Sequence, residues 1–83
     1  MDARKAVRRK MGTKGWIRLQ GGFSMRPCTI VDISPIGVGI SIDEPQLVSD
    51  PFELMLSRQT RETRRCSVRW RNGLRIGAKF FET

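Results

Sequence analysis

The chain has 83 residues, with 16 Lys or Arg against eight Asp or Glu and no histidine, so its formal net charge is +8. This length allows one small domain with a modest core, because a short chain leaves much of its surface exposed. No apolar run approaches the roughly 20 residues of a membrane-spanning helix. The basic N-terminus has no apolar segment behind it, so we expect neither a membrane span nor a secretory signal.

The first 13 residues are polar and basic, and they predict an N-terminal arm in front of a domain at residues 14–83. Positive charge is concentrated in this part of the chain. The first predicted strand is Lys14 to Leu19, where apolar residues alternate weakly. Gly21-Gly22 then favours a hairpin turn into a second strand, Arg26 to Ile33.

A tight corner, Asp32-Ile33-Ser34-Pro35-Ile36-Gly37, separates the second strand from a third, Val38 to Ile42. These residue types build turns, because Asp and Ser bond to nearby backbone, Pro fixes φ and Gly permits positive φ. Asp32 and Ser34 place a carboxylate and a hydroxyl two residues apart at the mouth of the corner. Turn formation alone would explain every one of these residues, and that interpretation stays open at this point.

The rest of the chain predicts three more strand segments. Phe52 to Ser57 alternates between apolar and polar residues, and a polar turn follows it. Cys66 to Arg71 alternates more clearly, which places Trp70 in the core. Asn72-Gly73 is a strong hairpin signal that favours a type I′ turn, after which Ile76 to Phe80 alternates again. We interpret most arginines of this ribbon as solvent-facing residues with a structural role.

No segment shows a persuasive 3.6-residue repeat, so the sequence predicts an all-β fold, a small antiparallel β-barrel of five or six strands. Cys28 and Cys66 lie in apolar alternating runs, which indicates reduced core thiols in a cytoplasmic protein rather than a disulfide. Two cysteines without histidine are too few for a zinc site, so no metal is expected. Ser34 and the cysteines lack a visible partner base, and we therefore expect no enzyme.

The basic balance suggests a phosphate-bearing partner, and three motifs narrow the choice. The arm contains Arg-x-x-x-Arg at Arg4 and Arg8, and the corner contains Asp-x-Ser-x-x-Gly from Asp32 to Gly37. The two predicted strands at the C-terminal end, which we call the terminal ribbon, contain Val-x-Trp-Arg at Val68 to Arg71 and Ile-Gly-x-x-Phe at Ile76 to Phe80. In this order the motifs resemble a PilZ domain over nearly the whole chain.

The resemblance implies a six-stranded antiparallel β-barrel with a flexible basic N-terminal arm that binds the bacterial second messenger cyclic di-GMP, with no further cofactor. A guanidinium can donate two parallel hydrogen bonds to guanine O6 and N7, form an ion pair with phosphate, or stack on a base. A carboxylate can accept from the guanine ring N–H and amino group, a serine can add a hydroxyl bond, and a glycine lets the backbone turn closely beside a ligand. The implied ligand-binding residues are Arg4, Arg8, Arg9, Asp32, Ser34 and Gly37.

The arm departs from the family pattern at Ala3, where PilZ arms often carry a further arginine. Lys5 and Arg9 have the same spacing, so the sequence leaves open which of the two pairs contacts the ligand. The alignment of Arg8-Arg9-Lys10-Met11 with the end of the family's arm favours Arg4 and Arg8. An arm that orders on binding loses entropy, so we expect an affinity near micromolar, about −8 kcal/mol.

The chain is too short to hold an output domain, so the resemblance implies a relay to an effector protein. Motility, exopolysaccharide production and cell-cycle control are the outputs that the family suggests. The alternative is a small basic barrel that binds RNA or single-stranded DNA through stacked aromatic residues. The absence of tyrosine argues against nucleic acid as the partner. A PilZ scaffold that binds no ligand is a third interpretation.

Overall fold

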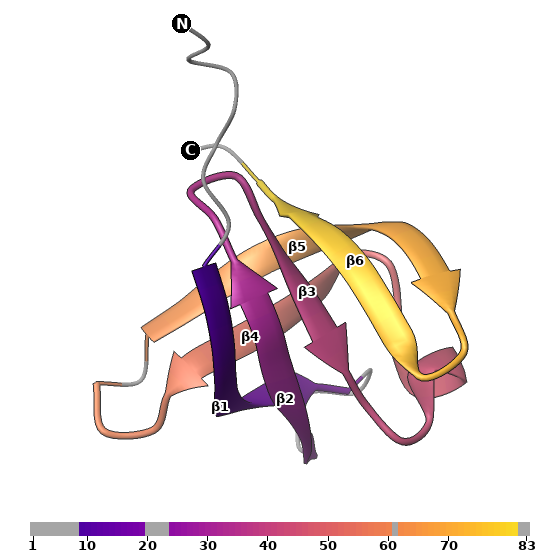
Figure 1. Cartoon of the computed structure of the whole chain (residues 1–83). Coiled ribbons are helices and arrows are strands. Elements are labelled where there is room, and N and C mark those ends of the chain that lie inside the picture. Colours follow the sequence, from indigo (N-terminus) through magenta and orange to yellow (C-terminus); the bar gives the residue numbers. More distant parts are fainter. Residues whose placement is uncertain (1–8, 20–23, 61, 82–83) are drawn as a thin grey trace, which may run out of the picture.

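The computed structural model describes residues 9–19, 24–60 and 62–81. Six strands close into a barrel in the order β1-β2-β3-β6-β5-β4, and every neighbouring pair is antiparallel (Figure 1). This architecture confirms the predicted all-β fold and its six-stranded antiparallel barrel. The elements are β1 (Arg9–Arg18), β2 (Met25–Ile33), β3 (Gly37–Ser41), the short 3₁₀ helix η1 (Pro45–Leu47), β4 (Phe52–Ser57), β5 (Glu62–Asn72) and β6 (Arg75–Phe80). No helix within these ranges is long and apolar enough to cross a membrane.

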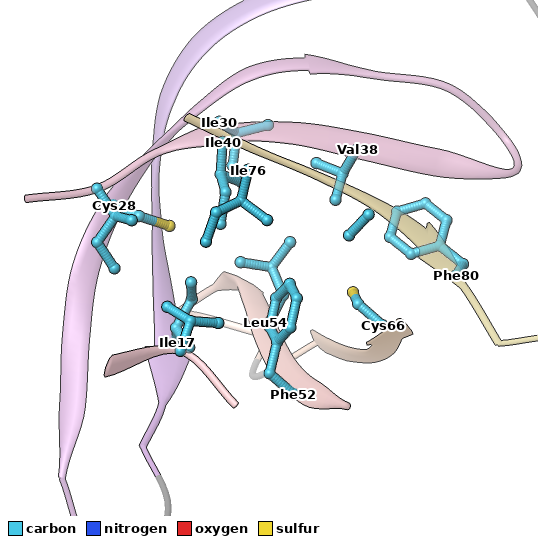
Figure 2. Packing of buried hydrophobic residues seen from close by; sticks show 13 residues of the cluster. Ile17, Cys28, Ile30, Val38, Ile40, Phe52, Leu54, Cys66, Ile76 and Phe80 are labelled. Atoms are coloured by element: carbon cyan, nitrogen blue, oxygen red, sulfur yellow. The ribbon is translucent and has the colours of Figure 1, made fainter. Parts of the chain in front are cut away.

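The barrel interior is filled by the apolar residues that alternate along the strands, because successive side chains of a strand point to opposite faces. Most of these residues are β-branched or aromatic, types that pack well on a pleated sheet. Cys28 and Cys66 are both buried and free, and Figure 2 shows their sulfur atoms within this cluster. The buried set is Ile17, Cys28, Ile30, Val38, Ile40, Ile42, Val48, Phe52, Leu54, Cys66, Ile76, Ala78 and Phe80.

The two buried thiols make stability depend on pH in the alkaline range. Burial raises the pKa of Cys28 to about 11 and that of Cys66 to about 12, from an ordinary value of about 9. Above pH 9 the unfolded chain releases these protons while the folded protein keeps them. The thiols therefore contribute full stability below pH 9, and this contribution falls by up to about 1.4 kcal/mol per pH unit for each thiol as the pH rises toward 12.

Urea unfolding at pH 8, 9 and 10 measures this fall in the free energy of unfolding. We expect a shallower fall for Cys28→Ala, which removes one of the two titrating groups. Equal slopes for the wild type and this variant would contradict the assignment to the buried thiols.

Strand β1 begins at Arg9, five residues before the predicted start at Lys14. Arg9 and Lys10 pair with the end of β2, so residues 9–13, which polarity alone assigned to the arm, form strand. A β-bulge lies between Lys10 and Thr13, where Gly12 has a φ of 72°. Residues 9–14 are all exposed, so neither face of this half of the strand is buried and no apolar alternation reveals it in the sequence.

The turn between β5 and β6 is shifted by one residue from its predicted position. Asn72 pairs with Arg75, so the two loop residues are Gly73 and Leu74 rather than Asn72 and Gly73. Gly73 has a φ of 61°, a left-handed conformation that glycine adopts without strain. Glycine thus occupies the first loop position, and Asn72 stays in the strand pairing.

The prediction that Trp70 lies in the core is wrong, because this side chain is on the outside of the barrel and 46% exposed. A β-bulge between Val68 and Trp70 gives β5 one residue more than β6 at this point. One extra residue reverses the alternation, so Val68 still packs against the core while Trp70 turns outward. The Asp50 carboxylate accepts a hydrogen bond of 3.0 Å from the Val68 N–H beside the bulge.

Arg71 of strand β5 is hydrogen-bonded to the loop that contains η1. Its guanidinium donates hydrogen bonds to the carbonyl oxygens of Pro45, at 2.7 Å, and Val48, at 2.9 Å. This arginine therefore has a structural role, in line with the interpretation of the basic ribbon.

Candidate functional site

The corner between β2 and β3 is a loop of two residues, Pro35 and Ile36, closed by a backbone bond of 2.9 Å from Ser34 N–H to the Gly37 carbonyl. The Ser34 hydroxyl oxygen also accepts bonds from the backbone N–H groups of Ile36, at 3.3 Å, and Gly37, at 3.2 Å. Ser34 is only 9% exposed. Its side chain therefore holds the turn together, which is the role that turn formation alone would give it.

Gly37 lies where β3 approaches β6 most closely. A Cβ at this position would lie 2.6 Å from the carbonyl oxygen of Ala78. Positive φ is found only at Gly12 and Gly73 among the described glycines, so Gly37 does not use the positive φ that glycine permits. Glycine is required here because the two backbones leave no room for a side chain. Figure 1 shows the corner beside the end of β6, and the two are joined by a bond of 2.9 Å from Phe80 N–H to the Ile36 carbonyl.

Asp32 lies on the outer face of the barrel because of a third β-bulge. Simple alternation after Ile30 would turn Asp32 inward, but β2 has one extra residue between them relative to β3. Ile33 packs against the core instead, and Asp32 faces outward. Its carboxylate lies over Gly39, where a Cβ would be 2.7 Å from Oδ1. The bulge thus brings this acceptor to the surface.

Five strands place Lys10, Asp32, Gly39, Gly77 and Trp70 side by side, and we call these five residues the outer row. Each residue is the pairing partner of the next across β1, β2, β3, β6 and β5. Neighbouring strands lie about 4.8 Å apart, so the backbones of Asp32 and Trp70 are roughly 14 Å apart.

The middle of the outer row has no side chains of its own, because both residues there are glycines. The side chains of Asp32 and Trp70 cover the backbone of these glycines from the two sides. The indole of Trp70 lies over Gly77, where a Cβ would collide with the ring, and the Asp32 carboxylate covers Gly39 from the other side. A substituent at either glycine would displace the neighbouring functional side chain. Both glycines are buried, so the middle of the outer row is covered by a carboxylate on one side and an aromatic ring on the other.

Two lysines lie at or next to the outer row. Lys10 lies at one end of the outer row, and Lys79, which is exposed, follows Gly77 by two residues on the same face of β6. An aromatic ring can stack on a planar base, a carboxylate can accept from the N–H groups of a guanine, and ammonium groups attract phosphate. Together these groups suit a ligand that carries both a purine and a phosphate.

Arg9 is the one predicted arm residue of the ligand-binding set that lies within the described part of the chain. Arg9 is exposed and begins β1 opposite Ile33, one position from the pair formed by Lys10 and Asp32. Arg4 and Arg8 lie outside the described residues. Of the predicted arm, Arg9 itself is therefore placed beside the corner, because it pairs with the last residue of β2.

Sequence reasoning missed Trp70 and the two glycines of the outer row. Period-two alternation assigned Trp70 to the core, and the bulge that reverses its direction leaves no simple mark in the sequence. A signal was nonetheless present, since Trp70 and Gly77 both belong to the terminal ribbon motif. Their cross-strand pairing across the Gly73 turn would have placed them together.

The family model of the PilZ domain matches residues 2–83, essentially the whole chain. No curated protein matches the chain in a sequence search. PilZ is a family of binding domains, not a catalytic one, and membership implies binding of cyclic di-GMP in general. The closed barrel, the corner motif and the matched range agree with one another. The chain therefore belongs to the PilZ domain family.

Proposed function

We propose that this protein is a receptor for cyclic di-GMP, which it binds between its N-terminal arm and the outer row, and that it relays the signal to an effector protein. Family membership supports the ligand in general. The observation that carries the position of the site is the outer row itself, where the side chains of Asp32 and Trp70 cover two paired glycines and so lie close to one another on one outer face. This arrangement puts an acceptor for guanine and a ring for stacking on one face of the barrel.

In this proposal each group has a distinct role. Asp32 accepts hydrogen bonds from the ring N–H and amino group of a guanine, and Trp70 stacks against a base. Arg4 and Arg8 reach the ligand from the arm and bind guanine edges or phosphates, with Arg9 beside them. Ser34 and Gly37 act mainly by holding the corner that fixes the direction of Asp32.

We place the receptor in the bacterial cytoplasm. Two free thiols in one small core fit a reducing compartment. Motility, exopolysaccharide production or cell-cycle control is the proposed output, through a separate effector protein.

Nucleic acid is the less suitable ligand for this face. A single-stranded polymer needs a continuous positive groove with several stacking rings. The outer row instead has one indole and, beside Lys10, a carboxylate that repels a phosphate backbone. The family match also does not favour this alternative.

Calorimetric titration of cyclic di-GMP tests the proposal in the wild type, Arg8→Ala and Trp70→Leu, at two salt concentrations. We expect binding near micromolar for the wild type and no measurable binding for Arg8→Ala. Loss of base stacking should weaken Trp70→Leu about 5- to 150-fold, since stacking contributes about 1–3 kcal/mol per base. Trp16→Leu is the matched control, because Trp16 lies on β1 outside the outer row, and this variant should bind like the wild type.

The absence of heat with folded wild-type protein would refute the receptor assignment. Binding of single-stranded DNA with a steep salt dependence would support the nucleic-acid alternative. Equal losses in Trp70→Leu and Trp16→Leu would refute the position of the site.

A further inference from the structure

A second surface feature lies on the outer face of β1, away from the outer row. It is a cavity of about 630 Å³ to which β1, β2, β4 and β5 contribute. Trp16 is central, because it pairs with Pro27 of β2 on one side and with Met55 of β4 on the other. Thr63 pairs with Met55 and continues the same line on β5. The volume falls within the range of about 300–1,000 Å³ that is typical of binding pockets.

The cavity combines an apolar floor with a basic rim. Met25 joins the apolar residues, whereas an outer barrel face that meets only water is normally polar. The guanidinium of Arg58 lies over the Trp16 ring, 5.4 Å from its centroid. Arg18, also at the rim, is bonded to Glu53 at 3.0 Å. Arg58 has no ion pair within the part of the chain that the structure describes, so its charge is available to a partner.

We propose that this cavity is a docking site for an acidic segment of a partner protein, with an apolar side chain against Met25 and Met55 and a carboxylate on Arg58. Charge complementarity supports this occupant, since the chain carries a net charge of +8 and the unpaired group at the rim is a cation. The cavity would be the surface at which the effector protein binds. Docking itself is independent of cyclic di-GMP, and only the coupling of docking to the cyclic di-GMP signal rests on the proposed function.

Other occupants fit the cavity less well. A nucleic acid would need free ring faces for stacking, but one face of Trp16 is taken by Arg58, and Glu53 adds a carboxylate beside Arg18. The arm of this chain is itself basic, so Arg58 would repel it.

The cavity and the outer row are built on opposite halves of one strand. Lys10 belongs to the outer row and Trp16 to the cavity, and six residues of β-strand separate them by about 20 Å. A partner can therefore dock while the ligand is bound.

The methionines provide direct probes of docking. Of the four in the chain, Met25 and Met55 line the cavity, whereas Met11 is 41% exposed in β1 and lies outside it. The experiment titrates the synthetic peptide acetyl-Glu-Glu-Leu-Phe-Glu-Glu-amide into full-length protein with ¹³C-labelled methionine methyl groups. We expect saturable shifts at Met25 and Met55 and none at Met11.

Charge-reversal variants separate specific docking from general attraction. Arg58→Glu should weaken peptide binding about tenfold or more, because it places a carboxylate against the acidic segment. Arg75→Glu makes the same change at an exposed position outside the cavity and should leave binding unchanged. A peptide with alanine in place of leucine and phenylalanine should produce no saturable shift.

Three outcomes would overturn the proposal. The first is an absence of saturable methyl shifts up to millimolar peptide. The second is an equal weakening of peptide binding by Arg58→Glu and Arg75→Glu. The third is saturation of the Met25 and Met55 methyl shifts by a thymidine decanucleotide, which would make the cavity a nucleic-acid site. The titration is repeated with Arg8→Ala and with cyclic di-GMP present. Peptide binding that persists in the wild type while cyclic di-GMP fails to bind this same wild-type protein would refute the receptor assignment alone.

Discussion

Replacing Asp32 by alanine should weaken cyclic di-GMP binding about 100-fold or more while leaving the barrel folded. In our proposal the carboxylate accepts two hydrogen bonds from one guanine, and a hydrogen bond to a charged group contributes about 1.5–3 kcal/mol. Without it, two guanine donors would face the bare backbone of Gly39 with no acceptor of equal strength. Calorimetric titration measures the loss, and thermal unfolding verifies that the variant is folded.

Asp43→Ala is the matched control for this prediction. It removes the same charge from an exposed position in the loop after β3, outside the outer row. We expect Asp43→Ala to bind like the wild type or slightly better, because the protein becomes more positive toward an anionic ligand. Similar affinities for the two variants would show that Asp32 does not touch the ligand.

Replacing Gly37 by alanine should lower the stability of the protein by about 2–3 kcal/mol. The new Cβ would lie 2.6 Å from the Ala78 carbonyl oxygen, and both are fixed to paired backbones that cannot rotate away. Relief requires β3 and β6 to separate at the corner, at the expense of the bond from Phe80 N–H to the Ile36 carbonyl. For a domain of this size the melting temperature should fall by roughly 10–20 °C.

Gly39→Ala provides the contrast, because its Cβ would meet the Asp32 side chain rather than backbone. A carboxylate can rotate, so the melting temperature should change little, while ligand binding should weaken as Asp32 is displaced. If Gly37→Ala instead kept the melting temperature of the wild type and lost only binding, the glycine would serve the ligand and not the contact between strands.

The amino-acid sequence determined the class of fold and the family. Alternation of apolar residues identified the strands, because burial of one strand face imposes a period of two. The corner was visible in the same way, since Asp, Ser, Pro and Gly each favour turns for a local reason. The three motifs then pointed to the PilZ family, which the match over residues 2–83 confirmed.

Only the tertiary structure decided which side chains share the outer face. Three bulges, next to Lys10, Asp32 and Trp70, each insert one residue and reverse the direction of everything beyond it. A bulge is stabilised by contacts with distant segments, such as the bond that Asp50 accepts from Val68 N–H, so no local pattern reveals it. The row that joins Asp32 to Trp70 across Gly39 and Gly77 exists because two hairpins distant in sequence, β2–β3 and β5–β6, pair through β3 and β6 in one register. The closure of the barrel fixes that register.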